Sequence, residues 1–300
     1  MPENKVDLFL DSGAYSAKTQ GAVIDIQEYI TFVKKYGEYL TVYANLDVIG
    51  DPQKTWNNQK IMEEAGLKPM PTFHFGEPLK WFQRYLNAGY DYIAIGGLVG
   101  AGDMIPFLDN LFGNHICNTP DHTPRVKIHG FGLTSLKLML RYPYYSVDST
   151  SWVMTGRMGS IFMPRCRGGK YIYDENSWKV TVSNKSPTIK DAGKHFSTMS
   201  PVEKRIVLEY VHSKGYAMGE SRWVEEDQTY TPKENERWSD KKPTDRKKLR
   251  RLEIIDVPGI SNNYQMRDEM NIVYFLDLEK SMPAWPWPFT VVRDRKGFDI

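Results

Sequence analysis

The chain has 300 residues, 41% of them hydrophobic and 25% charged, and a net charge of +2, which is typical of a soluble protein with one large domain and at most a subdomain. No apolar run is long enough to cross a bilayer, and the polar residues 1–6 lack the features of a signal peptide, so we expect a cytoplasmic protein without a membrane partner. The two cysteines, Cys117 and Cys166, lie far apart and the histidines do not cluster, which excludes a disulfide framework and a cysteine-rich zinc site and predicts neither a metal nor a cofactor.

The first 150 residues alternate between strand-like runs and helical patterns. Strands are expected at residues 7–11, 39–47, 70–75, 90–97, 125–132 and 144–150. Helices are expected at residues 24–40, 52–66, 77–89, 103–113 and 134–143, where apolar residues recur every three or four positions and glycines lie near the ends. This alternation predicts an α/β fold with a parallel sheet.

Each of the six predicted strands has, at its carboxyl end, residues that could bind or react with a ligand. These are Asp11, Asp47, His74, Gly96-Gly97, His129-Gly130 and Asp148. An open doubly wound sheet concentrates its ligand site at one switch point, whereas a TIM barrel brings all its strand ends to one mouth. Six consecutive strand ends of this kind therefore favour a TIM (β/α)8-type barrel.

The pattern changes after residue 150. Residues 158–185 indicate a β-meander, and residues 200–215 a helix that Ser200 caps. Residues 219–250 are polar and predict a long loop or insertion, residues 271–278 suggest a late strand, and the Pro-Trp cluster at 282–289 a docked tail. We therefore expect a barrel core over residues 1–218, with the meander as a β-rich insertion. Residues 219–300 would be a polar insertion and C-terminal elements that complete or pack on the barrel, with a basic run at 241–251.

Three carboxylates stand out among the strand ends. Asp11 and Asp47 each have a simple alternative role as a turn or helix cap, and Asp148 as a partner in a structural ion pair. Together at one barrel mouth they favour a site for a planar ligand that presents N–H groups. Backbone N–H groups at Gly96 and Gly97 are suited to a carbonyl oxygen of the same ligand.

Three motifs occur in the order found in a known enzyme family. They are DSGAY at 11–15, GGL at 96–98 and VDSTSWVMTGRMGSIF at 147–162. In sequence and order they resemble motifs of the tRNA-guanine transglycosylase family, over roughly residues 7–185. The resemblance implies a TIM barrel that exchanges a guanine in nucleic acid for a 7-deazaguanine.

By the same resemblance, Asp148 is the nucleophile that attacks the sugar C1′, and Asp11 is the base that deprotonates the incoming heterocycle. Asp47 would read the edge of the base. Further residues would line the base pocket: Tyr15 and His129 would stack on its two faces, His74 stands where the family has a glutamine, and Ser12, Gly96 and Gly97 would lie beside it.

The chain departs from the tRNA enzymes in lacking their zinc-binding cysteines and the segment before the first motif. It therefore has no zinc subdomain and is most similar to the phage-type DNA 7-deazaguanine transglycosylases. We expect an enzyme that inserts a 7-deazaguanine such as preQ0 into DNA through a covalent aspartyl intermediate. The alternatives are a tRNA enzyme of the same chemistry, a non-catalytic nucleic-acid-binding subunit and an unrelated barrel glycosidase.

Basic residues follow the last motif. Arg157, Arg165, Arg167 and Lys170 are suited to contacts with nucleic-acid phosphates, with Arg157 on the Thr-Arg position of the family. On charge alone, a solvated β-ribbon explains them equally well.

Overall fold

The computed structural model describes residues 7–98, 102–133, 135–187, 189–239 and 248–290. The chain divides into two compact units, which we describe separately: unit 1 is residues 1–149 with 283–300, and unit 2 is residues 150–282. The boundary thus lies near residue 150, whereas the sequence suggested one near residue 218. The reason is that the segment over 158–185 shares a hydrophobic core with helices that come later in the chain.

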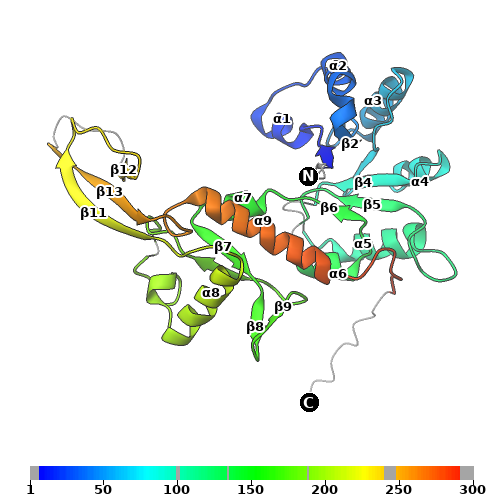
Figure 1. The fold of residues 1–300 in the computed structure, drawn as a ribbon. Coiled ribbons are helices and arrows are strands. Elements are labelled where there is room, and N and C mark those ends of the chain that lie inside the picture. Colours follow the sequence, from blue (N-terminus) through cyan, green and yellow to red (C-terminus); the bar gives the residue numbers. More distant parts are fainter. Residues whose placement is uncertain (1–6, 99–101, 134, 188, 240–247, 291–300) are drawn as a thin grey trace. The chain divides into compact units, whose positions relative to one another are not determined.

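Unit 1 is built on short parallel strands (Figure 1). They are β1 (Leu8–Leu10), β2 (Leu40–Tyr43), β3 (Thr72–His74), β4 (Tyr92–Gly96), β5 (Lys127–Gly130) and β6 (Ser146–Val147). β1 pairs with β2, and β3 to β6 form a second parallel sheet in chain order. A parallel bridge between Ala44 and Met70 connects the two sheets, so all six strands are neighbours in the order of the chain.

Helices separate these strands, which confirms the predicted mixed α/β fold with a parallel sheet. They are α1 (Ala14–Gln20), α2 (Ile26–Tyr36), α3 (Pro52–Glu64), α4 (Lys80–Asn87), α5 (Ile105–Leu111) and α6 (Leu136–Arg141). Local signals begin two of them: the side chains of Asp25 and Asp51 accept backbone N–H bonds at the first turns of α2 and α3. Buried residues such as Phe73, Ile93 and Ile128 form the interior of this unit.

The Pro-Trp segment at the end of the chain packs against unit 1, as expected of a docked tail. Phe289 is buried against Phe112 and Tyr142, with ring centroids 6.0 and 5.3 Å away. The indole N–H of Trp285 donates to the carbonyl of Pro143.

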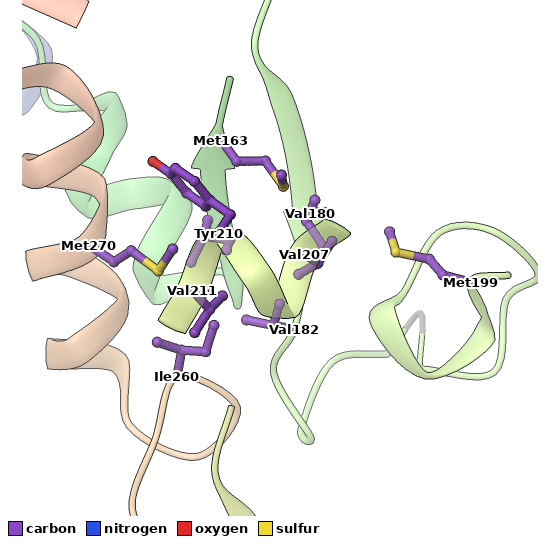
Figure 2. Packing of buried hydrophobic residues seen from close by; sticks show 10 residues of the cluster. Met163, Val180, Val182, Met199, Val207, Tyr210, Val211, Ile260 and Met270 are labelled. Atoms are coloured by element: carbon purple, nitrogen blue, oxygen red, sulfur yellow. The ribbon is translucent and has the colours of Figure 1, made fainter. Parts of the chain in front are cut away.

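Residues 158–185 of unit 2 form antiparallel strands, but their pairs are nested and do not follow the chain order of the predicted β-meander. β7 (Ser160–Met163) pairs with β10 (Trp178–Thr181), and β8 (Arg165–Arg167) pairs with β9 (Lys170–Ile172). Three helices accompany them: α7 (Ser151–Arg157), α8 (Pro201–Ser213) and α9 (Tyr264–Ser281). Figure 2 shows how β7, β10, α8 and α9 share one core, to which Met163, Val180, Tyr210 and Met270 contribute.

Two further expectations for this unit were wrong. Residues 219–250 are not a long loop, because they supply β11 (Glu220–Asp227), β12 (Glu236–Trp238) and the start of β13 (Leu249–Val257), in the sheet order β11-β13-β12. Two cation–aromatic contacts lie on this sheet: Arg251 lies over Trp223, and Arg250 over Trp238, each at 4.3 Å.

The second error concerns residues 271–278, which lie in α9 and not in a strand. Met270, Tyr274 and Leu278 recur every four residues and are buried, which is the helical period. Residues 241–247 of the basic run lie outside the described residues. None of the helices in the described ranges combines the length and apolar character that a bilayer crossing requires.

Candidate functional site

The three carboxylates singled out in the sequence gather at one edge of the unit 1 sheet. Asp11 follows β1, Asp47 lies four residues beyond β2, and Asp148 follows β6. Because these strands are parallel, their carboxyl ends meet at the same edge. The charges of Asp47 and Asp148 both raise the pKa of Asp11, so both carboxylates lie close enough to Asp11 to interact with it.

Asp11 is a carboxyl group that binds a proton more readily than an ordinary aspartate. Removal of water by the surrounding protein is the largest cause of its raised pKa, followed by the charge of Asp47. The backbone N–H groups of Gly13 and Ser12 act in the opposite direction but do not outweigh these effects. Gly13 holds the turn into α1 with a φ of 76°, a conformation that favours glycine. A carboxyl with a raised pKa is suited to general acid–base chemistry.

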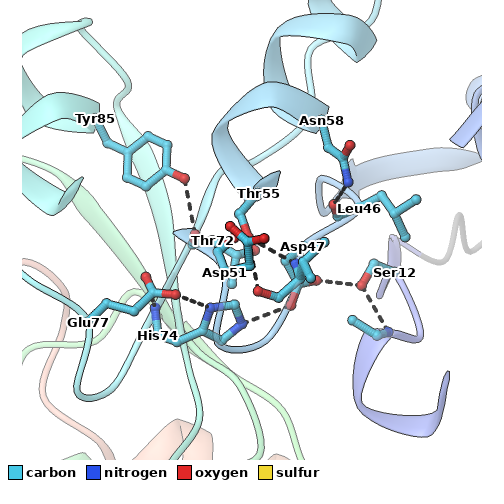
Figure 3. A network of polar contacts seen from close by, with 12 residues as sticks. Ser12, Leu46, Asp47, Asp51, Thr55, Asn58, Thr72, His74, Glu77 and Tyr85 are labelled. Carbon is cyan, nitrogen blue, oxygen red and sulfur yellow. Dashed lines mark hydrogen bonds and ion pairs between the residues drawn. The ribbon is translucent and has the colours of Figure 1, made fainter. Parts of the chain in front are cut away.

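Both oxygens of the Asp47 carboxylate are held by neighbouring side chains (Figure 3). The hydroxyl of Ser12 donates to Oδ1 at 2.6 Å, and Nε2 of His74 donates to Oδ2 at 2.8 Å. Asp47, Ser12 and His74 are each at least nine-tenths buried. Each carboxylate oxygen has a further lone pair, so a ligand with two adjacent N–H donors still has acceptors here.

Glu77 completes this network on the other side of His74. The Nδ1–H of His74 donates to Oε1 of Glu77 at 3.0 Å, and the backbone N–H of His74 donates to Oε2 at 3.1 Å. Burial lowers the pKa of His74, but the hydrogen bonds and charges of Asp47 and Glu77 outweigh it and raise the pKa to about 9. His74 is therefore an imidazolium at neutral pH, and both ring nitrogens donate.

Sequence reasoning missed Glu77. The signal was present as a His-x-x-Glu spacing where a strand ends, but only the turn after β3 brings the two side chains together.

The two glycines at the end of β4, Gly96 and Gly97, have different roles. A Cβ on Gly96 would lie 2.8 Å from Cδ2 of His74, so glycine is required for the His74 ring to pack against β4. Gly97 is exposed and has a φ of 72°, which also favours glycine. Gly96 therefore shapes the Asp47 network through His74.

His129 has different surroundings from those that the resemblance implied. Its ring is 2% exposed and stacks on Phe9, with centroids 4.5 Å apart, while Phe131 packs edge-on at 4.6 Å. Phe9 thus occupies one face of the His129 ring, and Phe9 itself is 36% exposed. Phe9 is a second residue that sequence reasoning missed, because nothing near it in the chain indicates its contact with β5.

Asp148 is partly exposed and anchored at one oxygen. Its Oδ1 accepts the backbone N–H of Gly132 at 2.7 Å and lies 3.6 Å from Nε2 of His129. Tyr15 lies in the first turn of α1 and is 58% exposed, so its ring is open to stacking on a ligand.

The predicted basic residues all belong to unit 2. Arg165 and Arg167 lie in β8 and Lys170 lies opposite Arg167 in β9, so the three share one face of the hairpin. All three are exposed, and Arg167 pairs with Glu175 at 2.8 Å. Arg157 is exposed at the end of α7. The structure therefore joins three of the four on one hairpin.

Metal-ligating side chains do not cluster in the part of the chain that the structure describes: no group of three or more His, Cys, Asp or Glu residues is arranged to hold a metal ion. Cys117 and Cys166 are both free thiols.

Comparisons with known proteins found no match: no protein-family model fits the chain, and neither a curated protein nor a solved structure is similar to it.

Proposed function

We propose that this protein is a DNA guanine transglycosylase, which replaces a guanine in DNA by a 7-deazaguanine such as preQ0 in the cytoplasm of the cell, or of the host cell if a phage encodes it. The observation that carries the proposal is the convergence of Asp11, Asp47 and Asp148 at one sheet edge. The motifs around these residues resemble those of the tRNA-guanine transglycosylase family, and the chain lacks that family's zinc-binding cysteines.

In this proposal Asp148 is the nucleophile. Its Oδ1 is anchored by the N–H of Gly132, which leaves Oδ2 to attack C1′ of the deoxyribose as the bond to guanine breaks. Two successive displacements at C1′ retain the configuration of the sugar, which requires a covalent glycosyl–aspartyl intermediate.

Asp11 carries the proton in both half-reactions. The leaving guanine takes up a proton at the nitrogen that was bound to the sugar, and the incoming base must lose one from the corresponding nitrogen. A carboxyl with a raised pKa is suited to giving the first proton and accepting the second. The protonation state of Asp11 is then the same at the end of the cycle as at the start.

Asp47 is suited to reading the base. Guanine and 7-deazaguanines both present an N–H beside an amino group, and a fixed carboxylate accepts both as a bidentate pair. Ser12 and the imidazolium of His74 hold Asp47 in place before the ligand arrives. The exposed ring of Tyr15 is positioned four residues after Asp11 to stack on the base.

We further propose that β1 to β6 are the first six strands of a TIM barrel. Two observations support this: the strands are neighbours in chain order, and the Phe9 ring in β1 stacks on the His129 ring in β5 at 4.5 Å. In a flat sheet the first and fifth strands lie about 19 Å apart, at about 4.8 Å per step. A contact between their side chains requires a strongly curved sheet.

The test is incubation of the protein with a labelled 7-deazaguanine and either guanine-containing DNA or tRNA. We expect label in DNA, and a covalent protein–DNA adduct that survives denaturation when the incoming base is omitted. Asp148→Asn should abolish both signals. Asp91→Asn, which changes an exposed carboxylate ahead of β4, is the matched control and should retain them.

Label in tRNA alone would assign the alternative tRNA activity. A wild-type protein that labels neither nucleic acid, or an Asp148→Asn variant with full activity, would defeat the proposed chemistry.

A further inference from the structure

One nitrogen of His129 has no assigned partner. Nε2 is buried with the rest of the ring, and among the described residues no group lies within hydrogen-bond distance of it. A buried polar atom without a partner costs free energy, on the order of 1–3 kcal/mol, so its surroundings call for an explanation. The charged group that it faces is Oδ1 of Asp148, 3.6 Å away.

We infer that His129 is a positioning residue for the Asp148 carboxylate, oriented by a chain of hydroxyl groups from Ser146 and Tyr92. This inference rests on the proposed function, in which Asp148 is the nucleophile. It replaces the role of a base-stacking ring that the family resemblance implied.

The chain of contacts runs across three neighbouring strands. The phenol oxygen of Tyr92 in β4 is hydrogen-bonded to Oγ of Ser146 in β6, and that Oγ lies 2.6 Å from Nδ1 of His129 in β5. Strand register produces this arrangement, because His129 lies directly opposite Ser146 in the ladder between β5 and β6. The ring therefore has a polar partner on its inner side and the carboxylate on its outer side.

Electrostatics favours one tautomer of the His129 ring. With the proton on Nδ1, the lone pair of Nε2 would face the Asp148 carboxylate, and this contact is repulsive because the buried His129 ring is shielded from water. With the proton on Nε2, the N–H points toward Oδ1, and Nδ1 accepts from Ser146. Ser146 then accepts from Tyr92, whose pKa is raised mainly by burial, so the phenol keeps its proton. The hydroxyl groups of Ser146 and Tyr92 then each have an acceptor, and the Nε2–H faces Oδ1 of Asp148 at 3.6 Å.

Aromatic packing fixes the ring plane. Phe9 stacks on the imidazole and Phe131 packs edge-on, so Nε2 cannot turn away from Asp148 without disturbing both contacts. Two N–H groups, from Gly132 and His129, then converge on Oδ1 and leave Oδ2 to react. Because Oδ1 becomes the carbonyl oxygen of the glycosyl ester, the same donors stabilise the carboxylate as it leaves in the second displacement.

The first test measures the tautomer and does not depend on activity. Long-range ¹H–¹⁵N correlation spectra of the ¹⁵N-labelled protein distinguish a protonated from an unprotonated ring nitrogen, and His129→Gln identifies the signals by their disappearance. We expect a protonated Nε2 and an acceptor Nδ1, and we expect Asp148→Asn to shift the Nε2–H signal. A proton on Nδ1, or an Nε2–H signal that Asp148→Asn leaves unchanged, would overturn the inference.

The second test uses two amide substitutions that each keep half of the ring's polar function. In His129→Gln the amide nitrogen reaches the position of Nε2, whereas in His129→Asn it reaches only the position of Nδ1. We expect His129→Asn to slow formation of the covalent adduct about 10- to 100-fold, the range found for groups that orient the ligands of catalytic metals. His129→Gln should stay within a few-fold of wild type, and the KM for the incoming base should not change.

Thermal unfolding of both variants checks that they fold alike. Equal adduct rates in His129→Asn and His129→Gln, or an effect on KM alone, would contradict a positioning role. A wild-type protein that forms no adduct would instead refute the proposed function, and the tautomer measurement would then decide by itself whether His129 donates to Asp148.

Discussion

The ring of Phe9 in β1 stacks on the ring of His129 in β5, with centroids 4.5 Å apart and an angle of 22° between the planes. The two residues are 120 positions apart in the chain. Their contact joins the first strand of unit 1 to the fifth and covers the imidazole that faces Asp148. The same pair therefore supports the curvature of the sheet and the geometry of the candidate nucleophile.

Replacing Phe9 with alanine should destabilise unit 1 by roughly 1–3 kcal/mol, less than for a fully buried phenylalanine because Phe9 is 36% exposed. Urea unfolding measures the change. Phe32→Ala is the control, since Phe32 is 46% exposed on α2 and its ring contacts that of Tyr36, four residues later in the same helix. Equal costs for the two variants would show that the contact between β1 and β5 contributes no special stability.

The imidazolium of His74 should make stability depend on pH. Its folded pKa of about 9 lies above the ordinary value of 6.5, so the protonated ring stabilises the folded state fully below about pH 6.5, and this contribution is lost as the pH rises through 9. His74→Gln cannot titrate. The stability difference between wild type and variant should therefore shrink by roughly 1–3 kcal/mol between pH 6.5 and 9.5. Urea unfolding at several pH values tests this, with the exposed His122→Gln as control. A difference that is constant with pH would argue against a charged His74.

Removing the charge of Asp47 should lower the pKa of Asp11. That charge is the second largest cause of the raised value, after burial, so the pKa in Asp47→Asn should fall but stay above that of an ordinary aspartate. Carboxyl ¹³C NMR titration measures it directly. Asp148→Asn should act in the same direction with a smaller effect, and Asp91→Asn should leave the Asp11 titration unchanged. Identical Asp11 titrations in wild type and Asp47→Asn would mean that the two carboxylates do not share a site.

A methyl group at Gly96 should disrupt the Asp47 network. The added Cβ would lie 2.8 Å from the His74 ring, which must shift away from its hydrogen bond to Asp47. We expect Gly96→Ala to cost about 1–3 kcal/mol and to reduce base exchange. Gly37→Ala is the control, since Gly37 has a φ of −58° and no atom within 4 Å of an added Cβ. Full activity in Gly96→Ala would show that the position of His74 does not matter for exchange.

The basic face of the β8–β9 hairpin should contribute to DNA affinity. Replacing Arg165, Arg167 and Lys170 together with alanine should weaken binding at low salt. The slope of log affinity against log salt should fall by up to about 2.7, at about 0.9 for each phosphate that the variant no longer neutralises. Fluorescence anisotropy with duplex and single-stranded DNA measures both quantities.

The control for this variant removes the same amount of charge from exposed lysines of unit 1, namely Lys34, Lys35 and Lys54. If both triple variants change the slope equally, the hairpin acts only through net charge and the solvated-ribbon interpretation is correct.

Sequence patterns predicted best those features that depend on neighbours along the chain. Ser200 followed by Pro201 indicated the start of a helix, and the structure has a capping box there between Ser200 and Glu203. The alternation of strands and helices in the first 150 residues predicted the parallel sheet for the same reason. Composition was a poorer guide: the polar residues 219–250 predicted a loop, yet the described part of this segment contains β11 and β12, and β13 begins at its end.

By itself, the sequence determined the order of the elements in unit 1 and the residues at the strand ends, because periodicity and caps are local. Only the tertiary structure decided which of those residues touch. It joined Asp47 to His74 and Glu77, and it covered His129 with Phe9. Such contacts depend on the curvature and register of the whole sheet, which many pairings between distant residues determine together. No short stretch of sequence specifies that curvature or register.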